Sequence, residues 1–439
     1  MTVALGARLP LSTFYRLRQD WDPTPALGRR CEVELMYPRC AGLDVHLRTV
    51  VACIRIAEGR SLRQEVRTFA TTTSGLLALT DWLSAEGVTH VVMESTGVYW
   101  QPVWYALEGT FDLTLANARH VRNVPGRKTD VNDSMWLADL LAHGLVQGSF
   151  VPPEPIQEAR DLTRTRTQLT REIAKHTQRI QKTLEKANIK LETVLTHVLG
   201  VTGRAIIRAL IEGQTDPDAL LALRRGKIKA SVDEMREALR GRPTESQRLL
   251  LRIHLHQIEE LEKSIDLIER RLGDVLRPFR REFELLLTIP GVSDTIASII
   301  LAEIGADMSR FPSSAHLVSW AGLCPGNDES AGKKRSTRLR KGDTWLKTAL
   351  VQGAWAATRK KNSTLRAQYY RLKPRRGGKK AAVALAASML TSAFHMLTRA
   401  VPYAEAAPIT DPHRQKETAK RLVFRLKHLG FDVQIRPAA

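Results

Sequence analysis

Two aspartates, Asp130 and Asp133, lie three positions apart in the segment GRKTDVNDSMWLADLL, at the start of an apolar helical run. Positions i and i+3 share a face of a helix, so both carboxylates would project into the same small volume. One interpretation is capping, with Asp130 as the N-cap, because the first turn of a helix favours negative charge. The other is a divalent cation, since Mg²⁺ is usually held by one or two carboxylates with waters and phosphate oxygens. The second interpretation requires further carboxylates elsewhere in the chain.

The elements that would position these aspartates follow from the periodicity of the surrounding sequence. Alternation and β-branched residues predict strands, and apolar residues at helical spacing predict helices. Strands are predicted over 41–45, 49–56, 65–72, 89–95 and 111–117, and helices over 74–87, 98–109 and 130–146. The resulting order, three strands followed by helix, strand, helix, strand and helix, is that of the ribonuclease H fold. Other α/β domains have a similar order, so the order alone is a weak indication.

Two more carboxylates fit this arrangement. Asp44 lies on the first predicted strand, where a charged group should not be buried unpaired, and Glu94 closes the fourth. In a ribonuclease H fold, Asp44, Glu94, Asp130 and Asp133 would converge at one edge of the sheet. Four such groups would repel one another, and two Mg²⁺ ions about 4 Å apart would relieve the repulsion and polarise a phosphate. We therefore predict a Mg²⁺ site at which Mn²⁺ could substitute.

The charge of the chain indicates the kind of partner. It has 439 residues, and its 67 Lys and Arg against 46 Asp and Glu give a formal charge of +21. A surplus of this size indicates a polyanion, for which nucleic acid is the usual candidate and a membrane surface the rival. We predict no membrane-spanning apolar run of about 18 residues and no signal segment. The expectation is a soluble, cytoplasmic, nucleoid-associated protein without a membrane partner.

Cysteine and histidine spacing bears on the kind of metal site. The four cysteines, Cys31, Cys40, Cys53 and Cys324, show no CxxC spacing, and the histidines show no HExxH pattern. These cysteines are therefore predicted to be reduced, mostly buried thiols rather than zinc ligands or disulfides. Any bound metal should be held by oxygen atoms.

The second half of the chain is predicted to be helical. Apolar residues seven or four apart over 162–195, and four or three apart over 251–275, predict two long helices of coiled-coil type. The segment between them, 196–246, is predicted to be helical with breaks at Gly200, at Gly213 with Pro217, and at Gly241 with Pro243. Such a segment would form a helical arm that extends and returns, although an ordinary helical bundle would give the same pattern.

The region from 285 onward combines apolar helices with basic loops. Pro290 and Gly291 separate two apolar runs, which predicts either a helix-hairpin-helix that contacts DNA phosphates or a plain packing unit. A basic loop over 333–341 and a later basic patch, KPRRGGKK (373–380), are predicted to contact phosphate. The predicted nucleic-acid contacts are Arg127, Lys128, Lys333, Lys334, Arg335, Arg338, Arg340, Lys341, Arg375, Arg376, Lys379 and Lys380.

Several segments together resemble one protein family. GLDVH, MESTGVYW, NARHVRNVPGRKTDVNDSMWLADLL, TIPGVSDTIASIILAEIG and WAGLCPGNDESAGKKR look like the DEDD-type insertion-sequence transposases, described as bridge-RNA-guided recombinases. The resemblance covers roughly 38–400. It implies an N-terminal extension (1–37), a RuvC-like domain (38–150), a coiled-coil arm (151–284), a mostly helical transposase domain (285–400) and a tail (401–439).

The resemblance also implies roles for individual residues. The acidic tetrad of the family corresponds to Asp44, Glu94, Asp130 and Asp133, and its nucleophilic serine to Ser330. Family members often read Ser-Gly at that position, whereas this chain reads Ser-Ala-Gly, and Ser336 lies six residues further on in the same loop. The resemblance further implies DNA as substrate and a structured noncoding guide RNA. We also expect a homo-oligomer, a dimer or tetramer, joined through the arm.

These observations predict a DNA recombinase that forms a covalent phosphoserine intermediate and moves its own element. One alternative is a RuvC-like nuclease or Holliday junction resolvase that uses water as the nucleophile. The other is a non-catalytic scaffold for nucleic acid. The intact set of four carboxylates argues against the scaffold, and a nuclease leaves the second, serine-bearing basic region unexplained.

Overall fold

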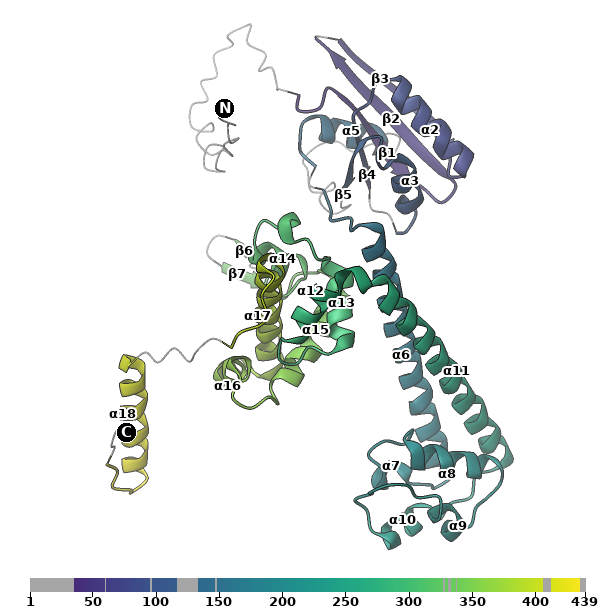
Figure 1. The fold of residues 1–439 in the computed structure, drawn as a ribbon, viewed down its shortest axis with the longest axis vertical. Helices are drawn as coiled ribbons and strands as arrows, with labels where there is room; N and C mark the ends of the chain where they lie inside the picture. The colour runs from purple at the N-terminus through teal and green to yellow at the C-terminus, as the bar shows by residue number, and fades with distance from the viewer. Residues whose placement is uncertain are drawn as a thin grey trace. The chain divides into compact units, whose positions relative to one another are not determined.

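The structure, a computed structural model, describes residues 35–59, 61–94, 97–116, 133–146, 148–326, 328–330, 333–336, 338–405 and 412–434. The predictions for Arg127, Lys128 and Asp130, and that for Cys31, lie outside the described residues. Backbone contacts divide the chain into two compact units, Met1–Val151 and Pro152–Ala439. Each unit is described by itself, with the element labels of Figure 1.

The N-terminal unit is built on a mixed sheet with helices on both faces. Within the described residues, five strands follow the order β3-β2-β1-β4-β5. β1 pairs in parallel with β4 and β4 with β5, while β2 is antiparallel to both β1 and β3. The bounds are β1 (Arg39–Val45), β2 (Thr49–Glu58), β3 (Ser61–Ala70), α2 (Thr73–Ala85), β4 (His90–Glu94), α3 (Trp100–Leu107), β5 (Asp112–Ala116) and α5 (Asp133–Ala142). For the residues that the structure describes, the predicted element order is confirmed, and the arrangement is consistent with a RuvC-like fold.

The alternation of side chains along β1 assigns its residues to the two faces of the sheet. Ala41, Leu43 and Val45 pack in one core with residues of α2 and α3. Cys40 lies in a second core with residues of α5. Because positions 40, 42 and 44 share a face, Gly42 and Asp44 lie on the side of the sheet that α5 covers.

The first half of the second unit is a pair of long helices. α6 (Glu154–Lys186) and α11 (Glu245–Val275) run side by side, and the short helices α7 to α10 lie at one end of the pair (Figure 1). The bounds are α7 (Leu191–Val194), α8 (Val201–Ile211), α9 (Pro217–Leu221) and α10 (Val232–Ala238). Gly200 is the N-cap of α8 and Pro217 the first residue of α9, so these predicted breaks are confirmed.

The apolar stripes of the two long helices face each other within one chain. Ile180 and Leu184 of α6 share a core with Leu251, Leu255 and Ile258 of α11. An arm that extends and returns therefore describes these helices. A supercoiled arm that joins two copies of the chain stays a prediction.

The remaining elements of the second unit form a mostly helical region. Their bounds are η1 (Arg277–Phe279), α12 (Arg280–Leu287), α13 (Asp294–Ile304), η2 (Met308–Arg310), α14 (Ser314–Trp320), β6 (Asp328–Ser330), β7 (Lys333–Ser336), α15 (Thr344–Ala357), α16 (Thr364–Arg376), α17 (Gly378–Arg399) and α18 (Pro412–His428). α12 and α13 flank the Pro290–Gly291 turn. A Cβ on Gly291 would lie 2.2 Å from the carbonyl oxygen of Gly353 in α15, so this turn packs tightly against a helix. The packing interpretation accounts for the glycine.

One helix corrects the expectation that the sequence has no long apolar run. α17 is long and apolar enough to cross a membrane by length and composition alone. Half of its most apolar window is buried within the protein, including Ala382, Leu385, Met389 and Ala393. Because it packs against α14, α15 and α16, we interpret α17 as the central helix of this region. Its apolar composition therefore fits a helix that protein covers on several sides.

Candidate active site

Asp44 and Glu94 lie on neighbouring parallel strands. β1 pairs with β4 so that Leu43 is opposite Met93, which places Asp44 and Glu94 one residue further along both strands. Glu94 shares a face of β4 with Val92, and Val92 packs in the core that contains α5. The two carboxylates therefore lie at the same end of adjacent strands and on the same face of the sheet, as the sequence predicted.

Asp133 is the first residue of α5, the helix that covers this face. A Cβ on Gly42 would lie 2.2 Å from the carbonyl oxygen of Ser134 and 2.5 Å from the amide nitrogen of Ala138. The first turn of α5 thus lies in direct backbone contact with β1, two residues before Asp44. Glycine at position 42 allows this approach, which holds Asp133 on the face that bears Asp44 and Glu94.

The structure gives Asp44 a partner that sequence reasoning missed. The Nε2 atom of His46 lies 3.1 Å from Oδ2 of Asp44, whose side chain is 27% exposed. Asp44 is therefore neither fully buried nor unpaired. The signal in the sequence was the spacing Asp-Val-His, which puts both side chains on one face of a strand end.

A partly buried ion pair fixes α5 to the sheet, since the Asp139 side chain is 41% exposed. The Arg55 side chain on β2 is 7% exposed, and its Nε donates to Oδ1 of Asp139 over 2.7 Å. Gln64 on β3 also donates to this oxygen. Two buried thiols lie nearby, and burial raises the pKa of Cys40 to about 11 and that of Cys53 to about 12. These two cysteines and Cys324 are free thiols, as predicted.

The donor set of the carboxylate face fits a hard divalent cation. Asp44, Glu94 and Asp133 offer only oxygen atoms, which Mg²⁺ and Mn²⁺ prefer. Within the described ranges, no group of three or more His, Cys, Asp or Glu side chains is arranged to hold a metal ion. The fourth predicted ligand, Asp130, lies outside these ranges. The tetrad as a metal site stays a prediction.

The two candidate nucleophiles lie on a short hairpin in the second unit. β6 and β7 are antiparallel, and Ser330, the last residue of β6, pairs with Lys333, the first residue of β7. Ser336 pairs with Asp328 at the other end of the hairpin, and its Oγ accepts a hydrogen bond from the amide of Arg338 over 3.2 Å. Ser330 is thus next to the turn, whereas Ser336 has a local structural role.

Close backbone packing holds the base of this hairpin together. Backbone hydrogen bonds continue beyond the two strands, toward α14 and α15. There Gly326 N donates to Arg338 O, and Arg340 N donates to Cys324 O. A Cβ on Gly342 would lie 2.4 Å from the amide nitrogen of Gly322, a glycine with φ +68°. Only glycines allow the two chain segments to approach this closely. The hairpin therefore projects from a narrow base between α14 and α15.

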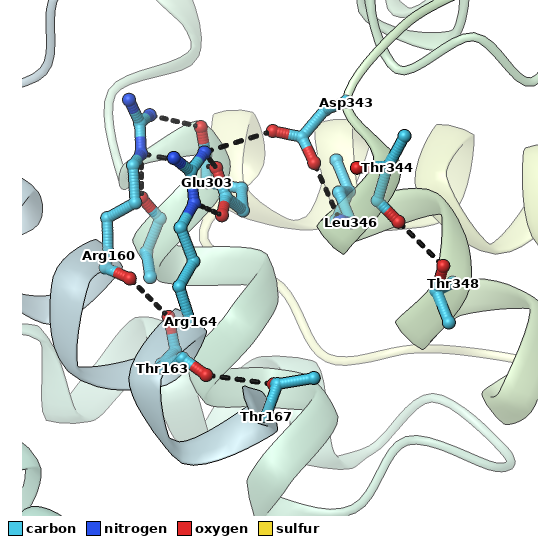
Figure 2. A network of polar contacts seen from close by, with 10 residues as sticks. Arg160, Thr163, Arg164, Thr167, Glu303, Asp343, Thr344, Leu346 and Thr348 are labelled. Carbon is cyan, nitrogen blue, oxygen red and sulfur yellow. Dashed lines mark hydrogen bonds and ion pairs between the residues drawn. The ribbon is translucent and has the colours of Figure 1, made fainter. Parts of the chain in front are cut away.

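A buried polar network joins this base to α6 (Figure 2). The Glu303 side chain on α13 has no exposed surface, and Arg164 of α6 donates to both of its carboxylate oxygens over 2.8 Å. Arg160 donates to the carbonyl oxygens of Ala302 and Glu303. Asp343 lies 3.6 Å from Arg164 and accepts a hydrogen bond from the amide of Leu346 as the N-cap of α15. Sequence reasoning missed all four side chains of this network.

Asp343 is the residue that connects this network to the hairpin. It directly follows Gly342 at the base, so an ion pair with α6 and a helix cap act on the same residue. Burial, partly opposed by Arg164, raises the pKa of Glu303 to about 7. The network therefore ties the long helix pair to the segment that carries Ser330.

The predicted nucleic-acid contacts that the structure describes lie in two parts of the second unit. Arg338, Arg340 and Lys341 at the hairpin base are exposed, and Arg340 also donates to Oγ of Ser319. Lys333, Lys334 and Arg335 lie on β7, and only their backbone is described. The residues of the second part lie around the α16–α17 junction and are exposed: Arg375, Arg376, Lys379 and Lys380.

Comparison with known proteins gives two family matches. Residues 41–189 match the DEDD transposase family of IS110, and residues 283–370 match the transposase family IS116/IS110/IS902. A protein of Pseudomonas aeruginosa strain PAO1, named "Probable family 20 transposase", is 32% identical over 111 residues. The match covers 25% of this chain and 32% of that protein, so the chain spans about a third of the length of this relative. Transposases with a DEDD domain generally use divalent metal ions.

Proposed function

We propose that this chain, which carries two transposase domains of the IS110 type, is the DNA recombinase of an insertion sequence. The observation that carries the proposal is the pairing of two sites in one chain. Asp44, Glu94 and Asp133 share one face of the sheet in the first unit, and Ser330 ends a strand of a projecting basic hairpin in the second. A hydrolytic nuclease has use for the first site only.

In the proposed reaction, Ser330 is the nucleophile. Its hydroxyl loses a proton as Oγ bonds to a DNA phosphorus atom, and the bond from that phosphorus to one sugar oxygen breaks. The leaving sugar oxygen takes up a proton. A sugar hydroxyl of the new partner strand then attacks the phosphoserine, which releases the serine and joins the strands. The energy of the phosphodiester bond is kept throughout.

The carboxylates and the basic residues have separate roles in this proposal. Asp44, Glu94, Asp130 and Asp133 would hold Mg²⁺ or Mn²⁺, which supplies charge stabilisation to the phosphorane-like transition state when bound. Arg338, Arg340 and Lys341 at the hairpin base position the DNA backbone. We assign Arg127 and Lys128 to the same task, because they directly precede Asp130 in the sequence.

The proposal includes a guide RNA and a homo-oligomer. The charge of +21 is sufficient for two nucleic acids, and the family resemblance of the motifs supports a structured noncoding RNA that selects the DNA sites. Leu249, Leu250 and Ile253 of α11 are exposed large apolar residues, which supports contact between arms of two copies. Such a protein acts in the cytoplasm on nucleoid DNA.

The covalent intermediate is the direct test of the function. The protein is incubated with labelled DNA carrying the ends of its own element, with Mg²⁺, and is then denatured and separated by electrophoresis. A recombinase leaves protein attached to a strand end, and Ser330→Ala removes this adduct while nucleic-acid binding persists. An adduct that survives Ser330→Ala and disappears in Ser336→Ala would move the nucleophile to Ser336.

Cleavage without any adduct would favour the water-dependent nuclease or Holliday junction resolvase. Binding without cleavage would favour the scaffold. The guide is tested separately by expressing the gene with its flanking DNA and sequencing the RNA that copurifies. Recombination by nuclease-treated protein that carries only random cellular RNA would contradict the guided mechanism.

A further inference from the structure

The segment from 344 to 400 has an extreme charge composition. It contains twelve Lys and Arg and no Asp or Glu. It forms α15, α16 and α17, and its basic side chains between Arg371 and Lys380 are exposed. In the described part of the chain, none of the basic side chains from Arg371 to Lys380 forms an ion pair with a carboxylate. Positive charge therefore accumulates over this surface without compensation, which favours a polyanion.

Three aromatic rings lie in a row within this surface. The ring of Trp355 on α15 lies 5.6 Å from that of Tyr369 on α16, which lies 5.2 Å from that of Tyr370. Tyr369 is buried and anchors the row, whereas Trp355 is 42% and Tyr370 49% exposed. A Cβ on Gly378 of α17 would lie 3.1 Å from the hydroxyl of Tyr369, so all three helices support the row.

Two cations flank the exposed ring at the end of the row. The guanidinium carbon of Arg366 lies 5.4 Å from the centre of the Tyr370 ring, and Nζ of Lys373 lies 5.9 Å from it. They are one helical turn before and after Tyr370. Pairs at this spacing also occur on ordinary helix surfaces, where they stabilise the helix slightly. Two exposed rings joined through a buried one, in a segment without Asp or Glu, go beyond that requirement.

We propose that this surface, the Tyr370 platform (Arg366, Tyr369, Tyr370, Lys373 and Trp355), binds unpaired nucleotides. A base stacks on the exposed ring, and the flanking cations contact the phosphates on either side. Duplex bases are excluded because their faces are covered by neighbouring base pairs. This inference rests on the proposed function, because strand exchange and a guide RNA would both present unpaired bases to the platform.

The test compares strands that differ only in their bases. Binding of full-length protein to labelled 15-mers of thymidine, uridine and abasic sugar-phosphate is measured by fluorescence anisotropy, with a duplex hairpin of the same charge as a fourth probe. The variants are Tyr370→Ala and Tyr370→Phe. Tyr105→Ala is the matched control, because Tyr105 on α3 is 45% exposed and lies in the other unit. Thermal melts establish that each variant is folded.

The platform predicts a loss that depends on the bases. Tyr370→Ala should weaken binding to at least one base-bearing strand by roughly 5- to 150-fold, the range for loss of one stacked base. Binding to the abasic strand and the duplex should change little, and Tyr370→Phe and Tyr105→Ala should bind as the unsubstituted protein does. A loss confined to uridine or to thymidine identifies the platform as an RNA or a DNA site.

An equal loss on the abasic strand, or no loss on either base-bearing strand, would overturn the proposal. These outcomes are independent of catalysis. Absence of a phosphoserine adduct in a protein that still shows base-dependent binding would remove the recombinase and keep the platform. An adduct formed by a protein without base-dependent binding would keep the recombinase and remove the platform.

Discussion

At the scale of single residues, the candidate active site depends on a carboxylate face and on a glycine that lets a helix approach it. Asp44 contacts His46, and Asp133 is held at the face by the close approach of α5 to Gly42. The carboxylates supply negative charge to the site, whereas Gly42 leaves the space that α5 occupies. Substitutions of the carboxylates and of Gly42 should therefore differ in their effects on cleavage and on stability.

The carboxylates should be required for cleavage and dispensable for folding. We expect Asp44→Ala, Glu94→Ala and Asp133→Ala to abolish Mg²⁺- or Mn²⁺-dependent DNA breakage, because each removes a ligand or a charge from the predicted metal site. Asp130→Ala should abolish breakage as well, whereas loss of a cap alone would cost only about 1 kcal/mol of stability. Cleavage assays run beside thermal melts separate these effects. Near-normal cleavage by Asp133→Ala would contradict the metal site.

Gly42→Ala should displace α5 without removing any carboxylate. The added methyl group would lie 2.2 Å from the carbonyl oxygen of Ser134, so the helix has to move and Asp133 moves with it. We expect a loss of about 1 to 3 kcal/mol in unfolding free energy, typical of overpacking, and a large loss of cleavage. Gly273→Ala on α11 is the control, since a Cβ there meets nothing within 4 Å. Equal behaviour of the two variants would show that α5 tolerates the shift.

At the scale of elements, the buried network at the start of α6 is the feature that connects arm and hairpin. Arg160 and Arg164 project from α6, Glu303 from α13, and Asp343 caps α15 (Figure 2). Removing one partner of a buried charge pair leaves an unpaired charge and typically costs 3–5 kcal/mol. The network should therefore control both the stability of the second unit and the position of the hairpin that carries Ser330.

The network should make the stability of the second unit depend on pH. The pKa of Glu303 is raised from its ordinary 4.5 to about 7, so the folded state binds this proton more tightly than the unfolded chain does. The resulting stabilisation is complete below about pH 4.5 and is lost as pH rises through about 7, for a total of about 3 kcal/mol.

Denaturant unfolding at several pH values, compared with Glu303→Gln, measures this contribution. Glutamine cannot titrate, so the difference in unfolding free energy between the two proteins should change between pH 5 and pH 8. Arg160, Arg164 and Asp343 face Glu303 and are present in both proteins, which makes the comparison specific for the one carboxyl group. A constant difference over this range would show that Glu303 keeps one protonation state.

At the scale of the whole molecule, the two candidate sites lie in different units of the chain. Nearly two hundred residues separate Asp133 from Ser330, and the contact division places them on opposite sides of Val151. The serine and the carboxylates can therefore meet within one chain or between two copies. We favour a composite site shared between copies, which would make cleavage depend on assembly.

A shared site predicts complementation between two inactive proteins. Ser330→Ala and Asp44→Ala are each expected to be inactive, and a mixture of the two should recover part of the cleavage, because one copy supplies the carboxylates and the other the serine. Cleavage is measured after mixing at a concentration that permits assembly. A mixture of Asp44→Ala with Asp133→Ala is the control, since both lack the same site. No recovery in the first mixture would place serine and carboxylates in the same copy.

The sequence by itself determined the elements and the class of the protein. Strand and helix periods are local properties of the chain, so the order around Asp44 and Glu94, the breaks at Gly200 and Pro217 and the long helix pair were all predictable. Net charge and motif spacing are also properties of the sequence, and they indicated nucleic acid and a transposase. One local expectation failed: the apolar run of α17 is present in the sequence, and only the tertiary structure shows that half of it is buried by protein.

Only the tertiary structure decided which distant residues meet. Arg55 and Asp139 are 84 positions apart, and Arg164 and Glu303 are 139 apart, so no periodicity relates them. Their pairing follows from the docking of α5 on the sheet and of α13 on α6. Buried charges have to find partners, and the packing of whole elements decides which partners are within reach. For the same reason Gly42 was only a strand residue in the sequence, and its role at the carboxylate face required the position of α5.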